Sequence, residues 1–217
     1  MTLKLNGSSS GYTAIDAPAT AGSNTLVLPP NNGSANQVLK TDGSGNLTWV
    51  DQGSGIFSSY AILEDIKAVN NHGGSNDSSG GWEKRDLTDE IDPSSIVTLS
   101  SSQFTLQAGT YLIKWRSPSH NTKEFLSRLY NATDSTSVKV GSSGHSGEAT
   151  SSTGGDGPDN VDSVGYARVT ISGAKAFEIQ MATDRTQATT GFGRGANAMG
   201  GGGESSIFTQ VEIWKES

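Results

Sequence analysis

Short runs in which apolar residues occupy alternate positions are the feature that most constrains the fold of this chain. Residues 104–115, with the sequence FTLQAGTYLIKW, contain two such runs on either side of Ala108 and Gly109. A period of two is typical of β-strands with one buried face, and small residues between two runs are typical of a hairpin turn. No segment sustains the 3.6-residue period of a helix, and Ala61–Val69, which comes nearest, is better explained as a strand by its flanks and spacing. The pattern therefore predicts an all-β fold.

The predicted strands of the main part of the chain lie beyond residue 58 and are separated by clusters of Gly, Ser, Asn and Thr. They are Tyr60–Val69, Trp82–Leu87, Ile96–Leu99, Gln103–Leu106, Thr110–Ser117, Lys123–Tyr130, Ser137–Gly141, Val161–Ile171, Ala174–Ala182 and Ser206–Lys215. Many short strands at regular spacing are typical of a β-sandwich or a barrel.

The first 50 residues predict a separate and smaller region. Its strands are very short (Leu26–Leu28, Gln37–Lys40 and Asn46–Val50), and Asp42–Asn46 has the composition of a hairpin turn. Because an isolated hairpin is marginal in water, we expect this region to intertwine with copies of itself. The predicted organisation is an N-terminal segment at 1–50, a linker at 51–57 and a main β domain at 58–217.

The composition predicts a thin hydrophobic core. Of the 217 residues, 32% are apolar, which is low for a globular protein, and 28 are glycine. The net charge of −7 is modest and the apolar residues cluster in patterned runs, so a loop-rich folded protein is favoured over disorder. Oligomerisation would bury further apolar surface and so compensate for a thin core, and we therefore expect the chain to form oligomers.

The same composition excludes several partners and sites. A negative net charge with only 15 Lys and Arg residues argues against nucleic acid as a partner. The absence of cysteine excludes disulfides, thiolate metal sites and a cysteine nucleophile. No run approaches the roughly 20 apolar residues of a membrane-spanning helix, and no secretory signal is visible at the N-terminus. We expect neither nucleic-acid binding nor membrane insertion.

The lengths of the connections predict two different ends for the sandwich. The long connections are Asn70–Gly81, Gly141–Asn160 and Thr183–Ser205, with Pro118–Thr122 of middling length, and the tight ones are Gln107–Thr110, Asn131–Thr136 and Ser172–Ala174. Because long and tight connections alternate, the long ones should share the end away from the C-terminus. Loops on a rigid scaffold carry function. The candidate contact residues in these loops are His72, His120, His145, Phe192, Arg194, Asn197 and Met199.

Two groups of loop residues could bind a metal ion, although we favour solvated loops for both. The three histidines could form a cluster, or one of them could surround an ion on a symmetry axis, but no two have ligand spacing. Asp156, Asp159 and Asp162 offer oxygens to calcium but lack the residue order of a hand-type calcium loop. We therefore expect no cofactor, with calcium or another metal in a distal loop as the alternative.

The sequence contains no catalytic motif. The stretch GFGRGA at 191–196 is similar to a nucleotide-binding loop, but no helix follows to meet a phosphate. There is no G-x-S-x-G elbow, and a pair of catalytic carboxylates is not recognisable from sequence. A thin core does not suggest a substrate groove. We expect that the protein is not an enzyme.

The large aromatic residues are expected to pack rather than to bind. Exposed aromatic rings can stack on sugars or anchor a partner, but core or subunit-interface packing is the favoured interpretation. In the last strand, Ile207, Val211 and Ile213 share one face and Phe208 and Trp214 the other, which predicts burial on both faces. The scaffold or interface candidates are Trp82, Tyr111, Trp115, Phe208 and Trp214.

Several segments of the main domain match a known family. They are GGSNDSSGGWEKRDLTDEI at 73–91, FTLQAGTYLIKWRSPS at 104–119, SRLYNATDST at 127–136 and IFTQVEIWKES at 207–217. Together they resemble the C-terminal head of phage tail-fibre and virion-fibre proteins, of the marine and cyanobacterial phage type. That head is similar to the TNF-like or complement-type jelly roll, which assembles as a trimer. Residues 21–50 resemble a segment that precedes such heads in phage fibre proteins.

The resemblance implies a trimeric TNF-like jelly-roll β-sandwich as the head and a short β-rich shaft or virion-attachment segment before it. The matching scaffold positions are Trp82, Arg85, Asp86, Phe104, Gly109, Tyr111, Tyr130 and Trp214. No receptor residue carries over, because the binding loops of such heads vary with the host. The chain has almost no shaft, which leaves its position in the virion open.

The function implied by the resemblance is adsorption. The homotrimer would bind a host cell-surface receptor, with a saccharide as the expected ligand, and would contact other virion structural proteins through the N-terminal segment. It would be made in the host cytoplasm and exposed on the assembled particle. The alternative is a structural accessory without a specific receptor, such as a capsid-decorating, head-fibre or collar protein. A polysaccharide-degrading enzyme is the least favoured hypothesis.

Overall fold

The structure is a computed structural model that describes residues 3–52, 56–147, 160–195 and 203–216. The chain divides into two compact units, Met1–Gly53 and Ser54–Ser217. The boundary falls inside the predicted linker, although Asp51 still belongs to a strand of the first unit and Phe57 already to a strand of the second. The described residues form strands, turns and irregular segments, and they include no helix long and apolar enough to cross a membrane.

The first unit contains two hairpins. β1 (Leu3–Asn6) pairs with β2 (Tyr12–Ile15), and β3 (Gln37–Thr41) pairs with β4 (Leu47–Asp51). β3 and β4 confirm the predicted hairpin. The prediction missed β1 and β2, and it was wrong about the strand at Leu26–Leu28, where Val27 makes only an isolated bridge.

The turn between β3 and β4 is held by one carboxylate. Asp42 accepts hydrogen bonds from the backbone N–H of Ser44 (2.7 Å) and Asn46 (3.1 Å) and from the side-chain amide of Asn46 (2.7 Å). These bonds, above all the one from the Asn46 side chain, lower the pKa of Asp42. An Asp that caps its own turn in this way explains why the Asp-Gly-Ser-Gly-Asn sequence folds as a hairpin.

The second unit contains the remaining strands. They are β5 (Phe57–Lys67), β6 (Trp82–Lys84), β7 (Asp89–Ile91), β8 (Val97–Ser100), β9 (Gln103–Leu106), β10 (Gly109–Ser119), β11 (Lys123–Asn131), β12 (Thr136–Ser146), β13 (Val161–Ile171), β14 (Lys175–Thr183) and β15 (Ser206–Glu216). Two differ clearly from the prediction, because β6 ends at Lys84 and β12 continues to Ser146. The prediction did not include β7.

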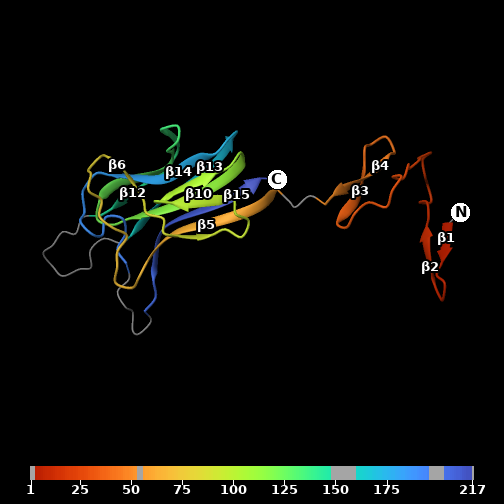
Figure 1. Ribbon diagram of the computed structural model, residues 1–217, viewed down its shortest axis with the longest axis horizontal. Helices are drawn as coiled ribbons and strands as arrows, with labels where there is room; N and C mark the ends of the chain where they lie inside the picture. Colours follow the sequence, from red (N-terminus) through yellow and green to blue (C-terminus); the bar gives the residue numbers. More distant parts are fainter. Residues whose placement is uncertain (1–2, 53–55, 148–159, 196–202, 217) are drawn as a thin grey trace. The chain divides into compact units, whose positions relative to one another are not determined.

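These strands form a jelly-roll β-sandwich. One sheet has the order β13-β10-β15-β5-β7, and the other has the order β12-β11-β14-β9-β8 with β6 added beside β14. The two layers are visible in Figure 1. The chain pairs like a ribbon folded back on itself, with β5 next to β15, β9 next to β14, β10 next to β13 and β11 next to β12. This pairing is the strand order of a jelly roll, so the expected fold class is confirmed.

The core lies between the two sheets and is built by the alternating residues that predicted the strands. Tyr111, Ile113 and Trp115 of β10 all point into it. The other large members are Leu63, Phe104, Leu106, Leu129, Phe177, Ile179, Val211 and Ile213. A Cβ atom on Gly165 of β13 would lie 2.0 Å from the Trp115 ring. The indole therefore fits only because β13 carries glycine at this position.

One face assignment in β15 was wrong. The sequence predicted that Ile207 shares a face with Val211 and that Phe208 lies on the opposite face. The pairing of β15 with β5 shifts register between Ile207 and Gln210, so Phe208 and its neighbour Thr209 are both buried and Ile207 is 42% exposed. A β-bulge of this kind turns two consecutive residues inward and leaves no trace in a two-residue period.

The long connections leave from one end of the sandwich, as predicted. Ser119 at the end of β10 pairs with Val161 at the start of β13, and Lys67 at the end of β5 pairs with Ser206 at the start of β15. We call this the loop end. Each of the three long connections begins and finishes at strand ends located there.

The tight connections lie at the opposite end, which we call the turn end. Gly109 of β10 pairs there with Ile171 of β13, and Phe57 pairs with Glu216 of the antiparallel last strand. The chain therefore enters the head beside the C-terminal strand, and Figure 1 shows this end of β15 next to the start of β5. The entry point and the long loops lie at opposite ends of the head.

Candidate functional site

The base of the loop end is a compact structure in which three loops hydrogen-bond to one another. They comprise residues 71–76, 120–122 and 185–195. The N–H of Gly73 donates to the carbonyl of Gly193 (2.9 Å), and the N–H of Phe192 donates to the carbonyl of Gly74 (3.0 Å). The N–H of His120 donates to the carbonyl of Gly191 (3.1 Å). Backbone bonds of this kind position the loops as a scaffold would.

Glycines make this close contact possible. A Cβ atom on Gly73 would lie 2.2 Å from the Phe192 carbonyl oxygen, and one on Gly195 would lie 2.0 Å from the Asn71 carbonyl oxygen. Any side chain at these positions would separate the loops. The glycine-rich sequence that suggested a flexible loop therefore reflects close packing at residues 191–195.

Asn76 fixes the loop after β5 to the loop after β14. Its side-chain amide donates to the hydroxyl of Thr183 (2.7 Å) and to the carbonyl of Arg185 (2.6 Å), and its side-chain oxygen accepts from the N–H of Gln187 (2.8 Å). Asn76 is buried. Sequence reasoning gave no reason to single out this residue, because an Asn in a polar loop looks like a solvated one.

A buried arginine supports the same loops from below. Arg85 donates from Nε to the Thr209 hydroxyl (3.0 Å) and from Nη2 to the Phe192 carbonyl (2.7 Å), and its guanidinium lies 4.0 Å from the centre of the Phe192 ring. Burial lowers the pKa of Arg85 to about 9, and the nearby Asp65 carboxylate opposes that shift. The hydrogen bonds and the aromatic ring replace part of the lost hydration.

Asp65 is the buried counter-charge of this region. Lys67 lies 3.0 Å from its Oδ1 and 2.9 Å from Oδ2 of Asp86. Burial raises the pKa of Asp65, and Lys67 counteracts this effect. β5 of one sheet carries Asp65, and Arg85 follows β6 of the other sheet. Opposite charges from the two sheets therefore lie near each other at the loop end.

The three histidines do not come together. His72 is half-buried and accepts a hydrogen bond at Nδ1 from the N–H of Gly195 (3.0 Å), whereas His120 is buried beneath the loop base. His145 was wrongly assigned to a loop and lies exposed on β12, opposite Glu124. Within the ranges that the structure describes, no group of three His, Asp or Glu side chains could hold a metal ion.

The remaining predicted contact residues have different environments. Phe192 is not available for contacts, because it is 7% exposed and packs with Phe125, Met181 and Arg85. Arg194 is exposed, as a contact residue should be. Asn197, Met199, Asp156 and Asp159 lie outside the described residues, while Asp162 belongs to β13.

A reciprocal pair of hydrogen bonds joins the segments that precede β13 and follow β14. The N–H of Arg194 donates to the side-chain oxygen of Asn160 (2.7 Å), and the side-chain amide of Asn160 donates to the carbonyl of Arg194 (2.7 Å). Asn160 thus fixes the backbone of Arg194 and leaves its guanidinium exposed. Among the predicted contact residues that the structure describes, Arg194 is therefore the best positioned for contacts.

The scaffold candidates separate into core and surface residues. Tyr111, Trp115 and Phe208 are in the core, whereas Trp214 is half-buried on the outer face of the five-stranded sheet. Trp82 is 36% exposed on the outer face of the other sheet. Packing in the core of a single chain therefore does not explain why Trp82 and Trp214 are tryptophan.

The outer face of the five-stranded sheet is aromatic and apolar near the turn end. Trp214 lies between Tyr60 and Leu112 in the strand register, and the Phe57 ring centre is 6.2 Å from the Trp214 ring centre. Tyr60 is 45% exposed, and Tyr166 on β13 of the same sheet is also exposed. Apolar rings collected on one sheet face are typical of a subunit interface.

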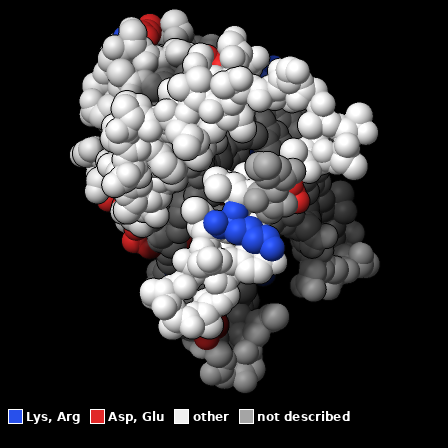
Figure 2. All heavy atoms as spheres, turned by 90° about the vertical axis from the view of Figure 1, so that its right-hand side faces the viewer, with Lys and Arg blue, Asp and Glu red and all other residues white. Residues whose placement is uncertain are grey.

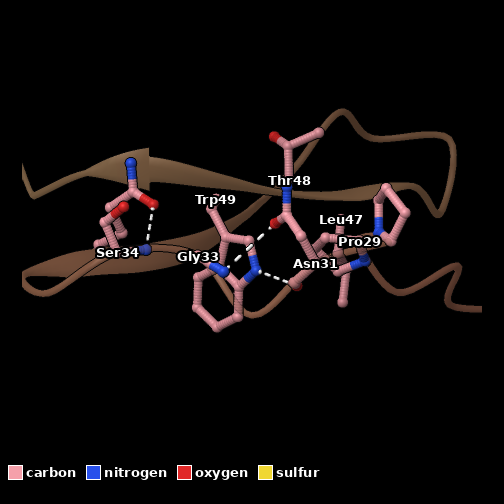
Figure 3. A pocket seen from close by; sticks show the side chains of 9 residues that line it. Pro29, Asn31, Gly33, Ser34, Leu47, Thr48 and Trp49 are labelled. Atoms are coloured by element: carbon pink, nitrogen blue, oxygen red, sulfur yellow. Dashed lines mark hydrogen bonds between the residues drawn. The ribbon is translucent and has the colours of Figure 1, made fainter.

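The first unit offers a shallow hollow of about 570 Å³ around Trp49. Figure 3 shows the indole ring on one side of the hollow and Pro29 and Leu47 on the other, and the indole N–H donates to the carbonyl of Asn31 (2.9 Å). The ring lies against Gly33, where a Cβ atom would approach it to 2.7 Å. The Trp49 ring of β4 therefore forms one wall of the hollow.

Charged residues make up 17% of the chain. On the face drawn in Figure 2, Lys, Arg, Asp and Glu side chains are few and scattered among uncharged residues. Among the described residues, this face shows no continuous basic surface of the kind that follows a phosphate backbone.

Comparisons with known proteins give the following result. No family model and no curated protein sequence matches the chain. Among solved structures, the chain is similar to murine APRIL, with 7% sequence identity and a TM-score of 0.42, over 72% of this chain and 98% of that one. The jelly-roll assignment rests on the strand order described above.

Proposed function

We propose that this chain is the subunit of a phage virion fibre, a homotrimer whose jelly-roll heads bind a saccharide receptor on the host cell. The observation that carries the proposal is the opposition of the two ends of the head. The chain enters at the turn end, where Phe57 pairs with Glu216, and the long loops leave from the other end. A head tethered at one end and bearing loops at the other is suited to adhesion.

The loop base supports this proposal because it is rigid where a binding site must be. Phe192 and Asn76 are buried, and the loops that contain them are joined by backbone hydrogen bonds. The residues of the loop base are therefore ordered before a ligand binds, which reduces the entropic cost of binding. Weak contacts by single heads would gain strength when three heads engage one surface together.

The outer face of the five-stranded sheet supports the trimer. Tyr60, Leu112 and Trp214 form an apolar row that a neighbouring copy can cover. A chain with a thin core gains stability from such burial, and a heterologous contact of this kind closes into a ring when the rotation is threefold.

The first unit supports attachment to other virion proteins. Its large apolar side chains, among them Leu5, Tyr12 and Leu28, are mostly more than half exposed. Two-stranded hairpins are marginal alone in water, so these residues need partners, which on this proposal are the other two copies and the virion proteins at the attachment point. Localisation to the assembled particle follows from the same proposal.

Competition for adsorption tests the receptor function. Purified full-length protein is added to host cells before virions, and unadsorbed virions are counted over time. The expected result is a dose-dependent loss of adsorption. Normal adsorption by virions that lack the protein would contradict the receptor function and favour a structural accessory. Release of reducing sugar from host polysaccharide would instead indicate an enzyme.

A further inference from the structure

The outer face of the six-stranded sheet carries a stacked group that the loop end does not use. The Arg128 guanidinium on β11 lies 4.0 Å from the centre of the Trp82 ring and 4.6 Å from the centre of the Tyr130 ring. Trp82 pairs with Ala182 on β14, and the small alanine side chain leaves room for the indole to lie over the sheet towards β11. We call Trp82, Arg128 and Tyr130 the sheet platform.

A row of hydrogen bonds fixes the platform from beneath. Arg128 Nε donates to Oε1 of Gln180 (2.8 Å), Gln180 Nε2 donates to Oε1 of Glu178 (2.5 Å), and Gln103 Nε2 donates to Oε2 of Glu178 (2.7 Å). Glu178 is 7% exposed and Gln180 is 9% exposed. A charged and amide network that is buried on the outer face of a sheet holds Arg128 in one orientation.

The upper side of the platform is open and carries unused donors. In the part of the chain that the structure describes, no hydrogen bond involves the Trp82 indole N–H, the Tyr130 hydroxyl or the two Nη atoms of Arg128, and the Tyr130 and Arg128 atoms reach solvent. Trp82 remains 36% exposed. An aromatic surface that is ringed by fixed donors matches a ligand with one apolar face and hydroxyl groups around its edge.

We propose that the sheet platform is a saccharide-binding site, in which the C–H face of a pyranose stacks on Trp82 and its hydroxyls accept from Arg128 and Tyr130. This inference rests on the proposed receptor function and places a contact outside the loops. The platform lies on the opposite sheet from the proposed subunit interface, so trimer formation leaves it accessible. Its rigidity favours binding, because neither the guanidinium nor the indole has to be ordered by the ligand.

Saturation-transfer NMR on the full chain tests the site. The probes are the methyl pyranosides of glucose, galactose and mannose, N-acetylglucosamine and glucuronic acid, each at millimolar concentration. We expect transfer to at least one of them, and about tenfold weaker binding of that sugar to Trp82→Ala and Arg128→Ala. Tyr130→Phe, which removes only a hydroxyl, should weaken binding without affecting folding. The absence of transfer to every probe would overturn the proposal.

Matched controls separate the platform from general effects. Lys139→Ala removes an exposed cation from the neighbouring strand β12, and Tyr12→Ala removes an exposed aromatic ring from the first unit. Both should bind the sugar as the wild-type protein does. Binding by Trp82→Ala equal to that of the wild-type protein would contradict the platform, provided that both proteins show the same thermal unfolding.

The adsorption assay distinguishes failure of the platform from failure of the proposed function. Equal competition by the wild-type protein and Trp82→Ala would show that adsorption does not use the platform and would leave the receptor function intact. Sugar binding that Trp82→Ala loses, together with no competition by the wild-type protein, would confirm the site and refute the receptor function. Competition that Trp82→Ala loses supports both.

Discussion

Individual glycines decide how closely the layers and loops of this molecule can approach. Gly165 lies under the Trp115 ring in the core, and Gly73 and Gly195 lie under neighbouring carbonyls at the loop base. At each position a Cβ atom would lie 2.0–2.2 Å from its nearest neighbour, so neighbouring atoms would have to shift. Their role is therefore steric, and it comes from packing rather than from a special backbone angle.

Substitution of Gly165 tests this steric role. Gly165→Ala should destabilise the head by about 1–3 kcal/mol, because the added methyl overpacks a buried ring. Gly173→Ala is the matched control, since a Cβ atom there meets nothing within 4 Å. Urea unfolding monitored by tryptophan fluorescence measures both. Equal free energies of unfolding for the two variants would show that β13 can shift away from Trp115.

The buried Arg85 should contribute strongly to the stability of the head. Arg85→Ala should cost about 3–5 kcal/mol, because it removes the buried hydrogen bonds to Thr209 and Phe192 and leaves the buried Asp65 carboxylate with Lys67 as its remaining cation. Adding Asp65→Asn should recover part of this loss. A double-mutant cycle on the free energy of unfolding checks it. Strict additivity would contradict the inferred coupling between the two residues.

The sequence predicted the location of some residues correctly and of others wrongly. Tyr111 and Trp115 were placed correctly because alternation along β10 fixes which residues face inward. Phe192 was misplaced as a loop contact, because a sequence pattern cannot show that glycines let two loops close over a ring. Arg85 was expected to be scaffold only from family resemblance, and nothing in its neighbours indicates a buried charge.

At the scale of elements, the tight connections of the turn end are stabilised by side chains within the turns. Asp134, between β11 and β12, accepts from Lys175 Nζ (2.5 Å) and from the Asn131 side-chain amide (2.9 Å). The bond from Lys175 is the main cause of the lowered pKa of Asp134. The ion pair links the β11–β12 turn to the start of β14.

This lowered pKa predicts how stability depends on pH. The Asp134–Lys175 ion pair stabilises the folded state. This stabilisation is fully present above the ordinary Asp pKa of 3.8 and is lost as the pH falls through the lower pKa of Asp134 in the folded state. The melting temperature of the wild-type protein should therefore exceed that of Lys175→Met at neutral pH, and the difference should vanish in acid. Lys139→Met, which removes an exposed lysine of β12, is the control. A difference that persists in acid would assign the effect to packing.

The strands themselves were largely predictable because their two-residue period reports directly which face is buried. β9 and β13 have the predicted bounds. The bulge in β15 and the extension of β12 to Ser146 were not predictable, because both depend on the partner strand. The short strand β7 pairs only through the edge of β5, so tertiary context determines it.

At the scale of the whole molecule, a trimer of heads requires a surface that is buried only in the assembly. Trp214, Tyr60 and Phe57 form that surface near the turn end. Charge placed among these rings should prevent association without disturbing the core behind them, since the core uses the opposite face of the sheet. The residues of the turn end are thus expected to determine the oligomeric state, and those of the loop end to determine binding.

A charge substitution tests this assignment. Trp214→Glu should convert the assembly to monomers, because a carboxylate in an apolar interface loses its hydration without gaining a partner. Lys139→Glu, which places the same charge at an exposed position of edge strand β12 in the other sheet, should leave the assembly intact. Sedimentation velocity reports both. Dissociation caused equally by both substitutions would mean that net charge, and not this face, controls assembly.

The mass of the unmodified protein in solution tests the central claim, that the chain acts as a trimer of heads. Light scattering coupled to size-exclusion chromatography, at micromolar concentration, should give three times the chain mass of 22.5 kDa. The same measurement on residues 54–217 should also give a trimer, because the proposed interface belongs to the head. A mass of 22.5 kDa for the full chain at that concentration would contradict the account.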